Sequence, residues 1–300
     1  MDALRGLVIS ACFLLAQAAS ATPYGDSTAR LQRLTADYPG LVTMIDIGMN
    51  DQGVVIRGVR IEDPSSRATV KPRHLVVGTH HGNEELSADV AQSFAERLIA
   101  ALEDSNAPMH AALAGNVYFV VPVLNVTGYN VSRREETGRN GRTLDPNRDY
   151  PDPCTTDQPF QLASTRRLSE FVAAEEIVAA VTIHGYIGTF TYPWGIFTTN
   201  THTPDQAAFS AMSQQVVAVN RYSTGTHADA IYPTAGAFED WAYFEHGVWV
   251  TLLELANRPN VTRDADSLLK YFAIAPDVRS TQHDHMGSCT NVPLTIIARP

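Results

Sequence analysis

The sequence predicts an α/β protein in which helices cover both faces of one sheet. Short apolar runs that are typical of strands alternate along the chain with patterns that are typical of helices. Of the 300 residues, 44% are hydrophobic and 18% are charged, which provides enough apolar surface for one large core. No repeat, low-complexity tract or linker divides the chain, so we expect one folded domain over residues 22–300.

The elements can be placed in order from these patterns. We expect strands over the apolar runs at residues 42–47, 54–61, 74–78, 117–123, 177–184 and 248–255. We expect helices at residues 27–38, 85–101, 163–174, 204–220 and 264–275. The second helix has the clearest pattern, because apolar residues recur at every fourth position from Leu86 to Leu98.

Three long connections remain between these elements, at residues 124–162, 186–203 and 223–241. Long loops in a compact domain usually carry function. We therefore expect part of a functional site in these segments.

Residues 1–21 have the pattern of a secretory signal peptide. Arg5 supplies a positive charge, residues 6–15 form an apolar stretch, and residues 19–21 offer small side chains for cleavage. The apolar stretch is too short to cross a bilayer, so cleavage is expected rather than a membrane anchor. The mature protein is then expected to be secreted.

Cysteine usage fits an oxidising compartment. Cys12 lies in the signal segment, which leaves Cys154 and Cys289 in the mature chain. An even pair in an exported protein favours one disulfide bond, and two separate buried thiols are the alternative.

Charge and hydropathy exclude two classes of partner. The formal net charge is −10 at pH 7, whereas nucleic-acid binders carry basic patches, so no nucleic-acid partner is expected. No segment after residue 21 is apolar for long enough to span a membrane. We expect a monomer with no membrane partner.

Two histidines and a glutamate are placed as ligands for one metal ion. His81 follows the predicted strand at residues 74–78, and Glu84 begins the next helix. Taken alone, Glu84 would more simply be a carboxylate that caps this helix than a metal ligand. His184 ends another predicted strand, and ligands of open α/β sheets bind at the carboxyl ends of strands. Such a set suits Zn²⁺ and leaves the fourth position open, as in catalytic sites. His80 competes as a ligand, although only His81 has the three-residue spacing to Glu84.

A further carboxylate lies in an unusual place. Glu254 is part of the apolar run at residues 249–255, where an unpaired carboxylate is costly to bury. Alternation along the strand would place it on a solvated face. Beside a metal site it would instead serve as a general base.

A polar loop offers cationic side chains. Its arginines are Arg133, Arg134, Arg139, Arg142 and Arg148. The guanidinium of Arg148, next to Asn147, can bind a carboxylate through two parallel hydrogen bonds, and a solvated basic loop is the alternative.

Five motifs combine these residues in a fixed order. They are His81-Gly-Asn-Glu84, Asn125-Val-Thr-Gly128, Asp145-Pro-Asn147-Arg148, His184-Gly-Tyr186 with Tyr192-Pro193-Trp194-Gly195, and Ile231-Tyr232 with Asp240-Trp241 and Glu254-Leu255. Together they resemble the motifs of the zinc carboxypeptidases, the carboxypeptidase A-like metallopeptidases with a single zinc ion. The resemblance spans about residues 22–275. The departures are Val126-Thr127, Pro146 and Ala256-Asn257 after Leu255; they affect the frame of the loops and leave the metal residues intact.

The resemblance implies a fold and a reacting centre. The fold would be a mixed, twisted sheet of eight strands with helices on both faces. His81, Glu84 and His184 would bind one Zn²⁺ per chain, and Glu254 would activate water as the general base.

The resemblance also implies how the substrate is held. Asn147, Arg148 and Tyr232 would bind the terminal carboxylate of a peptide. An arginine upstream of Asn147 would stabilise the oxyanion, and we expect Arg134 in this role. The competing candidates are Arg133 and Arg139.

The expected function is that of a secreted zinc metallocarboxypeptidase acting on the C-terminal bond of peptides or proteins. Glu239 precedes Asp240, at a position that lines the pocket for the C-terminal side chain in the resembled family, so basic C-terminal residues are the predicted preference. A loop shifted by one residue would instead turn Phe238 to the pocket and Glu239 to water. The alternatives are a zinc amidase, deacylase or cell-wall peptidase of the same fold, and a non-catalytic zinc-binding module.

Overall fold

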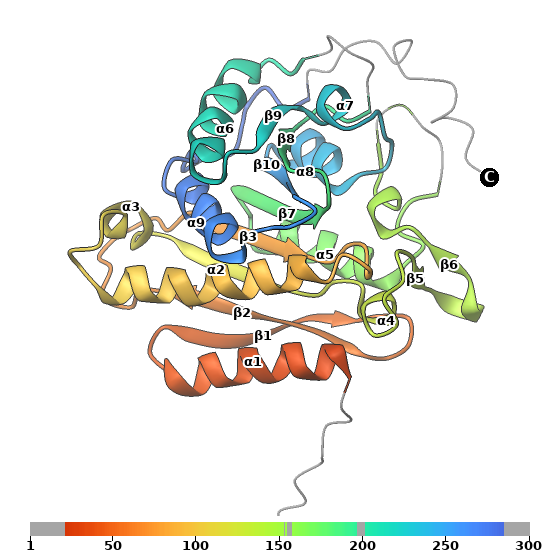
Figure 1. The fold of residues 1–300 in the computed structure, drawn as a ribbon, viewed down its shortest axis with the longest axis horizontal. Coiled ribbons are helices and arrows are strands. Elements are labelled where there is room, and N and C mark those ends of the chain that lie inside the picture. The colour runs from red at the N-terminus through yellow and green to blue at the C-terminus, as the bar shows by residue number, and fades with distance from the viewer. Residues whose placement is uncertain (1–21, 153, 155–157, 197–201, 285–300) are drawn as a thin grey trace, which may run out of the picture.

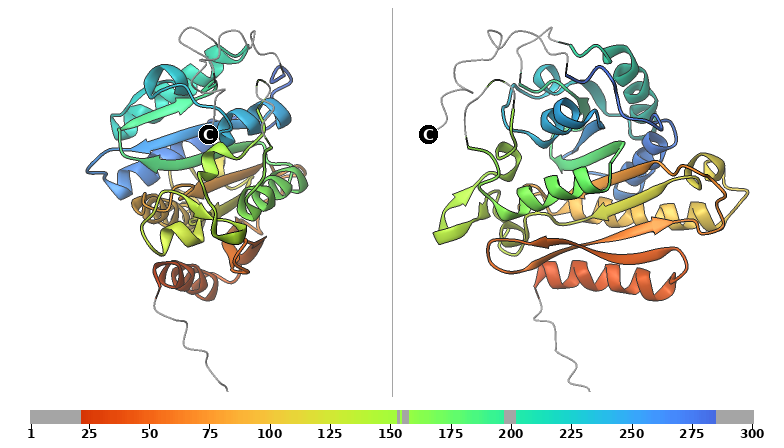
Figure 2. Two further views of the ribbon diagram at one scale, coloured as in Figure 1. Left: turned by 90° about the vertical axis from the view of Figure 1, so that its right-hand side faces the viewer. Right: turned by 180° about the vertical axis from the view of Figure 1, so that it is seen from behind.

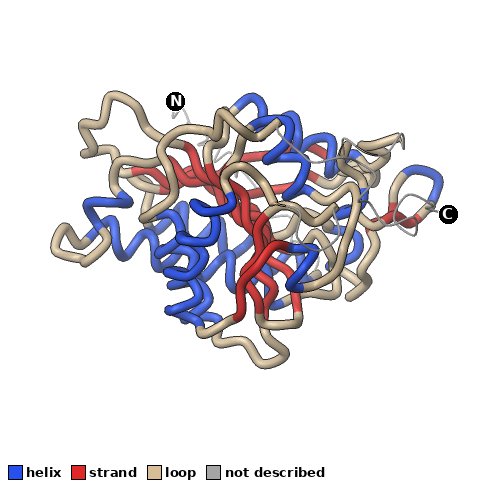
Figure 3. The backbone as a smooth tube through the Cα atoms, turned by 90° about the horizontal axis from the view of Figure 1, so that it is seen from above, coloured by secondary structure: helices blue, strands red, loops and turns tan. Residues whose placement is uncertain are grey.

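One mixed sheet organises the chain. The computed structural model describes residues 22–152, 154, 158–196 and 202–284. Within these ranges eight strands pair in the order β1-β2-β4-β3-β7-β10-β8-β9. Helices lie on both sides of the sheet when it is seen from above (Figure 3). The predicted α/β class and the eight-stranded sheet implied by the resemblance are thereby confirmed.

The strands and helices have the following bounds. The strands of the sheet are β1 (Val42–Met49), β2 (Val55–Glu62), β3 (Arg73–Gly78), β4 (Val117–Val121), β7 (Ala179–Gly185), β8 (Thr189–Tyr192), β9 (Ser223–Thr226) and β10 (Trp249–Leu255), and a small hairpin joins β5 (Glu136–Thr137) to β6 (Thr143–Leu144). The helices are α1 (Pro23–Asp37), α2 (Leu86–Glu103), α3 (His110–Leu113), α4 (Val126–Tyr129), α5 (Ala163–Ala174), α6 (Gln206–Asn220), α7 (His227–Ala230), α8 (Phe238–His246) and α9 (Val261–Phe272).

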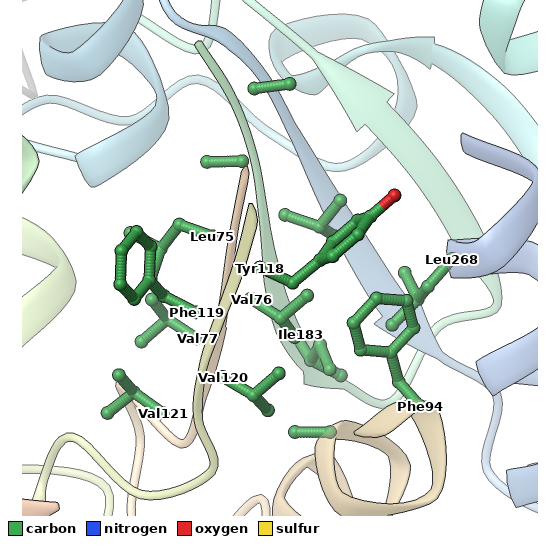
Figure 4. Packing of buried hydrophobic residues seen from close by; sticks show 14 of the residues in the cluster. Leu75, Val76, Val77, Phe94, Tyr118, Phe119, Val120, Val121, Ile183 and Leu268 are labelled. Atoms are coloured by element: carbon green, nitrogen blue, oxygen red, sulfur yellow. The ribbon is translucent and has the colours of Figure 1, made fainter. Parts of the chain in front are cut away.

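The central strands β4, β3, β7 and β10 run parallel to one another and are buried on both faces. Tyr118 of β4 packs against Phe94 of α2 and Phe272 of α9, with ring centroids 6.3 and 5.8 Å apart. The next residue, Phe119, packs against Phe171 of α5 at 5.0 Å. Figure 4 shows Tyr118 and Phe119 on opposite sides of their strand.

Helices α2 and α5 therefore cover opposite faces. Helix α2 lies in front of the sheet in Figure 1, and α5 lies in front of it in the view from behind (Figure 2). The apolar stripe predicted for α2 is the buried one, because Val90, Phe94 and Leu98 have no exposed surface.

Most predicted elements are found with shifted ends, and caps explain several shifts. Helix α1 begins at Pro23 rather than at residue 27, because the Thr22 side chain accepts a hydrogen bond from the Gly25 N–H. Helix α9 begins at Val261, where Asn260 caps it in the same way. Strand β4 ends at Val121 because Pro122, which follows, has no N–H to donate.

The expected long connections at residues 186–203 and 223–241 are wrong as plain loops. They contain β8 and β9 and the short helix α7, and α8 begins within the second. The two strands have four residues each, which is too short for a periodic pattern to stand out. They become strands because β8 pairs with β10 and β9 pairs with β8.

Some expectations concern segments beyond the described ranges. The predicted signal peptide at residues 1–21 lies outside them. Cys154 is disulfide-bonded, while its predicted partner Cys289 lies outside the described residues. Across the described ranges, the structure has no helix with the length and apolar character needed to cross a membrane.

Candidate active site

Three neighbouring strands end at one edge of the sheet. Strands β3, β7 and β10 are parallel, and their register places Gly78 opposite Ile183 and His184 opposite Glu254. His81 follows the end of β3 by three residues. Because parallel strands bring their carboxyl ends to a common edge, His81, His184 and Glu254 gather there, as the sequence predicts.

His81, Glu84 and His184 are in contact. The His81 Nδ1 atom lies 2.8 Å from Glu84 Oε1, and the His184 Nδ1 atom lies 3.0 Å from Glu84 Oε2. The two Nδ1 atoms are 3.1 Å apart. The predicted competitor, His80, takes another role: its Nε2 atom bonds to the Tyr150 hydroxyl at 3.1 Å, and its ring stacks on His184.

This arrangement fits a divalent cation. Two ring nitrogens that face each other at this distance can share a proton or a metal ion, and the buried carboxylate beside them adds negative charge. Burial alone would raise the pKa of Glu84, but the charges of His184 and His81 and their hydrogen bonds hold that pKa at about 2. Two imidazoles and one carboxylate, with ligand atoms within 4.8 Å of one another, are a ligand set of zinc.

The second ring nitrogens of both histidines are also engaged. Asp145 Oδ1 lies 3.1 Å from His81 Nε2, and Asn147 Nδ2 lies 3.5 Å from His184 Nε2. A carboxylate that orients a metal-binding imidazole is common around such sites. From the sequence, Asp145 was placed in a motif but given no role. A histidine that binds a metal often needs an anionic partner, and this requirement could have identified Asp145.

One cleft of about 220 Å³ joins these groups. The side chains from the predicted site that line it within the described residues are His81, Glu84, Arg134, Asn147, Arg148, His184, Tyr232 and Glu254.

Glu254 lies on the wall of this cleft and is only 8% exposed. The alternative of a solvated strand face is therefore wrong. Burial raises the pKa of Glu254 to about 7, a value suited to a general base. A cation bound by the three neighbouring ligands would favour the ionised carboxylate.

Of the three candidate arginines, only Arg134 lines the cleft. Its Nη1 atom lies 3.1 Å from His81 Nδ1, and its Nη2 atom lies 2.8 Å from Asp145 Oδ2. Arg139 bonds to Asp51 and its side chain is 78% exposed. Arg133 is exposed as well.

Arg148 and Tyr232 form the outer part of the cleft. The Arg148 Nη2 atom donates to the Tyr232 hydroxyl at 3.4 Å, and Tyr232 is 48% exposed. Asn147 is buried between them and the metal site, and its Oδ1 atom accepts from the Phe238 N–H at 2.8 Å. Amide, guanidinium and hydroxyl donors thus meet beside the metal ligands.

Glu239 is buried below Asn147 rather than turned to water. Its carboxylate accepts hydrogen bonds from the Thr182 hydroxyl and, at 3.4 Å, from Asn147 Nδ2. Phe238 is buried too, against the rings of His80 and Tyr150. The predicted alternative, in which Glu239 faces water, is wrong.

Asn125 holds two site loops in place. Its Nδ2 atom donates to the backbone carbonyls of His80 and Arg134 at 3.1 and 3.0 Å. Next to it the backbone is tightly packed, since a Cβ on Gly82 would lie 2.1 Å from the carbonyl carbon of Gly128. The loops that carry His81 and Arg134 are therefore fastened to each other.

Known proteins support the same interpretation. The family model described as zinc carboxypeptidase matches residues 28–283. A carboxypeptidase B from Astacus astacus is 25% identical over 79% of this chain and 86% of its own length. Zinc carboxypeptidase A 1 from Drosophila melanogaster is 29% identical over 73% of this chain and 57% of its own length.

Solved structures show the same fold. A crystal structure of thrombin activatable fibrinolysis inhibitor superposes with a TM-score of 0.74 at 17% identity, covering 84% of this chain and 73% of that one. The carboxypeptidase A of Helicoverpa armigera has a TM-score of 0.69 at 16% identity, covering 84% and 71%. From the family match and the geometry of the site, this chain belongs to the zinc carboxypeptidase family, and it is a zinc metallocarboxypeptidase whose metal site is formed by His81, Glu84 and His184.

Proposed function

We propose that the protein is a secreted, monomeric enzyme that removes the C-terminal residue of peptides or proteins, with a preference for basic residues. One observation carries the core of this proposal. A metal site, a buried carboxylate and a cluster of carboxylate-binding donors share a single cleft. Export is supported by the signal pattern at residues 1–21.

The side chains divide the work in the following way. When bound, zinc supplies a Lewis acid that polarises the scissile carbonyl and acidifies water. Glu254 accepts the proton of the attacking water and passes it to the leaving amine. Arg134 faces the carbonyl oxygen as negative charge develops there.

The free C-terminus identifies the substrate. Asn147, Arg148 and Tyr232 offer hydrogen-bond donors to its carboxylate, and the guanidinium of Arg148 can bind it in bidentate fashion. A bond far from a chain end would place no carboxylate beside these donors. This favours cleavage of the last peptide bond over internal cleavage.

Glu239 supports the preference for basic residues. It is a buried carboxylate that does not itself line the cleft but accepts a hydrogen bond from Asn147, which does. A substrate ammonium or guanidinium would give it the cationic partner that a buried charge requires. Similar proteins include some named carboxypeptidase B, in Astacus astacus, Canis lupus familiaris and Homo sapiens, and others named zinc carboxypeptidase A 1.

The test uses the mature protein, residues 22–300, with a mixed peptide pool. Mass spectrometry should show peptides shortened by one C-terminal residue, and a chelator should prevent the shortening. Values of kcat/KM for matched peptides ending in Arg, Lys, Phe and Leu then define the preference on wild type and Glu239→Ala. Internal cleavage would contradict the function. A preference for Phe or Leu that Glu239→Ala leaves unchanged would contradict the role of Glu239.

A further inference from the structure

The cleft contains a buried histidine to which the preceding mechanism gives no role. His227 lines the cleft together with the metal ligands, Arg148 and Tyr232, and it is only 7% exposed. Neither of its ring nitrogens has a hydrogen-bond partner among the described residues. Buried polar groups in native proteins are nearly always paired, so this ring needs an explanation.

The ring is held in place without using its nitrogens. It meets the ring of Tyr232 edge-on, with centroids 6.1 Å apart. The ring also packs closely against Gly195: a Cβ atom added to this glycine would lie only 3.1 Å from His227 Cδ2. Both contacts are made by carbon atoms or ring faces, so the nitrogens remain available to a ligand in the cleft.

A second buried histidine shows what a purely structural role would look like. His74 also lacks hydrogen-bond partners within the described ranges, but it lies between the rings of Tyr118 and Phe272, at 5.3 and 5.1 Å. It does not line the cleft that contains the metal ligands. His227 differs because its ring borders the substrate cleft.

The position of His227 determines which part of a substrate it can reach. Arg148 and Tyr232 are the proposed holders of the terminal carboxylate, and His227 packs against Tyr232. The side chain of the C-terminal residue leaves the carbon that bears this carboxylate. Together with the carboxylate itself, it is therefore the substrate group that we expect near His227.

The charge state of His227 restricts the partner. Burial, together with the positive charges of Arg148 and His184, lowers the pKa of His227 to about 3, so the ring is neutral at pH 7. A neutral imidazole has one acceptor nitrogen and does not repel a cation. Lysine and arginine side chains offer only donors, which suits this acceptor, whereas an apolar side chain would leave it unpaired.

We propose that His227 is a specificity-determining residue whose acceptor nitrogen takes a hydrogen bond from the ammonium or guanidinium of a basic C-terminal side chain. The inference rests on the proposed carboxypeptidase function and adds a residue to its selectivity.

The experiment compares zinc-loaded wild type with His227→Leu and His227→Gln on matched peptides ending in Arg, Lys, Gln and Leu. Because a hydrogen bond to a charged group is lost, His227→Leu should reduce kcat/KM for Arg and Lys peptides by about tenfold or more, chiefly through KM. The Leu peptide should change less than about twofold. His227→Gln, which keeps an acceptor oxygen, should retain most of the selectivity.

Three outcomes would overturn the inference: an equal loss on all four peptides, no loss on the basic ones, or a wild-type preference for Gln over Arg and Lys. If His227→Leu does not fold, His227→Phe keeps the ring shape and is expected to show the same selective loss.

Calorimetric binding of free arginine and free leucine to the same proteins separates this inference from the proposed function. Arginine binding that depends on His227 in a protein that shortens no peptide would remove the function and keep the inference. Peptide shortening whose selectivity does not depend on His227 would support the function and overturn the inference.

Discussion

The carboxylates at this site are costly to bury as charged groups, and their neighbours decide whether the charge is compensated. Glu84 is held ionised by two imidazoles, whereas Glu254 lacks such a partner and has its pKa raised to about 7 by burial. Two carboxylates at one sheet edge thus have different environments. This difference suits Glu84 to hold a metal ion and suits Glu254 to the proposed role of base, which requires a proton exchange near neutral pH.

Replacing Glu254 by Gln should abolish turnover and spare binding. The amide keeps the shape of the side chain but cannot accept a proton, so kcat should fall by about 10²–10⁴-fold. Zinc content, measured by atomic absorption, should stay at one ion per chain. Retained kcat would move the base to another residue.

Replacing Asp145 by Ala should weaken metal binding without removing a ligand. His81 Nε2 would lose the oxygen at 3.1 Å that orients its ring, and such partners typically contribute about 10–100-fold to metal affinity. Competition with a fluorescent zinc chelator measures this loss. Asp145→Asn, which keeps an oxygen acceptor, should lose less, and equal affinities in all three proteins would exclude the orienting role.

At the scale of elements, helix α5 anchors the loop that carries Asn147 and Arg148, the proposed substrate-binding residues. Asp149 accepts hydrogen bonds from the backbone N–H groups of Gln161 and Leu162, each at 2.9 Å, just before the helix begins. Asp149 follows Arg148 directly in the chain. The N-terminus of α5, where carboxylates are favoured, therefore sets the position of the loop at residues 145–150.

Glu136 of β5 contacts the same end of α5, and from its environment we predict a pH-dependent stability. It is fully buried, and its carboxyl accepts a hydrogen bond from the Ser164 hydroxyl. Burial, together with the charges of Asp51 and Asp149, raises the pKa of Glu136 from 4.5 to about 8. Between these values the folded state keeps a proton that the unfolded state releases, so stability falls as pH rises through this window.

The variant Glu136→Gln cannot titrate and should escape this loss. Its Tm should exceed that of wild type at pH 8 by more than at pH 5, by about 2–4 °C for each kcal/mol relieved. Differential scanning calorimetry at both pH values measures the change. The control is Glu103→Gln at an exposed position, whose Tm difference from wild type should be the same at both pH values. If the Tm difference of Glu136→Gln is also the same at both pH values, the proposed effect of Glu136 on stability is refuted.

At the scale of the whole molecule, the metal site ties together strands that are distant in sequence. His81 follows β3 and His184 is the penultimate residue of β7, 103 positions further along the chain. A ligand that binds only the folded protein stabilises it, and zinc binds here to both strands at once.

Removing zinc should therefore lower stability as well as abolish activity. At a free zinc concentration about 1,000-fold above Kd, binding contributes about 4 kcal/mol, which corresponds to a fall in Tm on the order of 10 °C after chelation. Thermal unfolding with and without chelator measures this shift. His184→Ala, which lacks one ligand, should respond little to either zinc or chelator, whereas a full response would reassign the site.

The sequence by itself determined what short-range patterns encode. Apolar runs identified the strands of the centre, and the three-residue spacing of His81 and Glu84 identified the ligand pair. His184 and Glu254 were found because each lies near the end of an apolar run, and parallel strands end at a common edge. Local spacing and strand ends suffice for these residues because they follow from backbone geometry alone.

The tertiary structure alone decided the rest. It separated Arg134 from Arg133, brought Asp145 to His81, buried Glu239 and placed His227 in the cleft. Each of these depends on contacts between segments far apart in the chain, and neighbouring residues in a loop differ only in the direction of their side chains. That direction is set by packing and by strand register, which no local sequence pattern specifies.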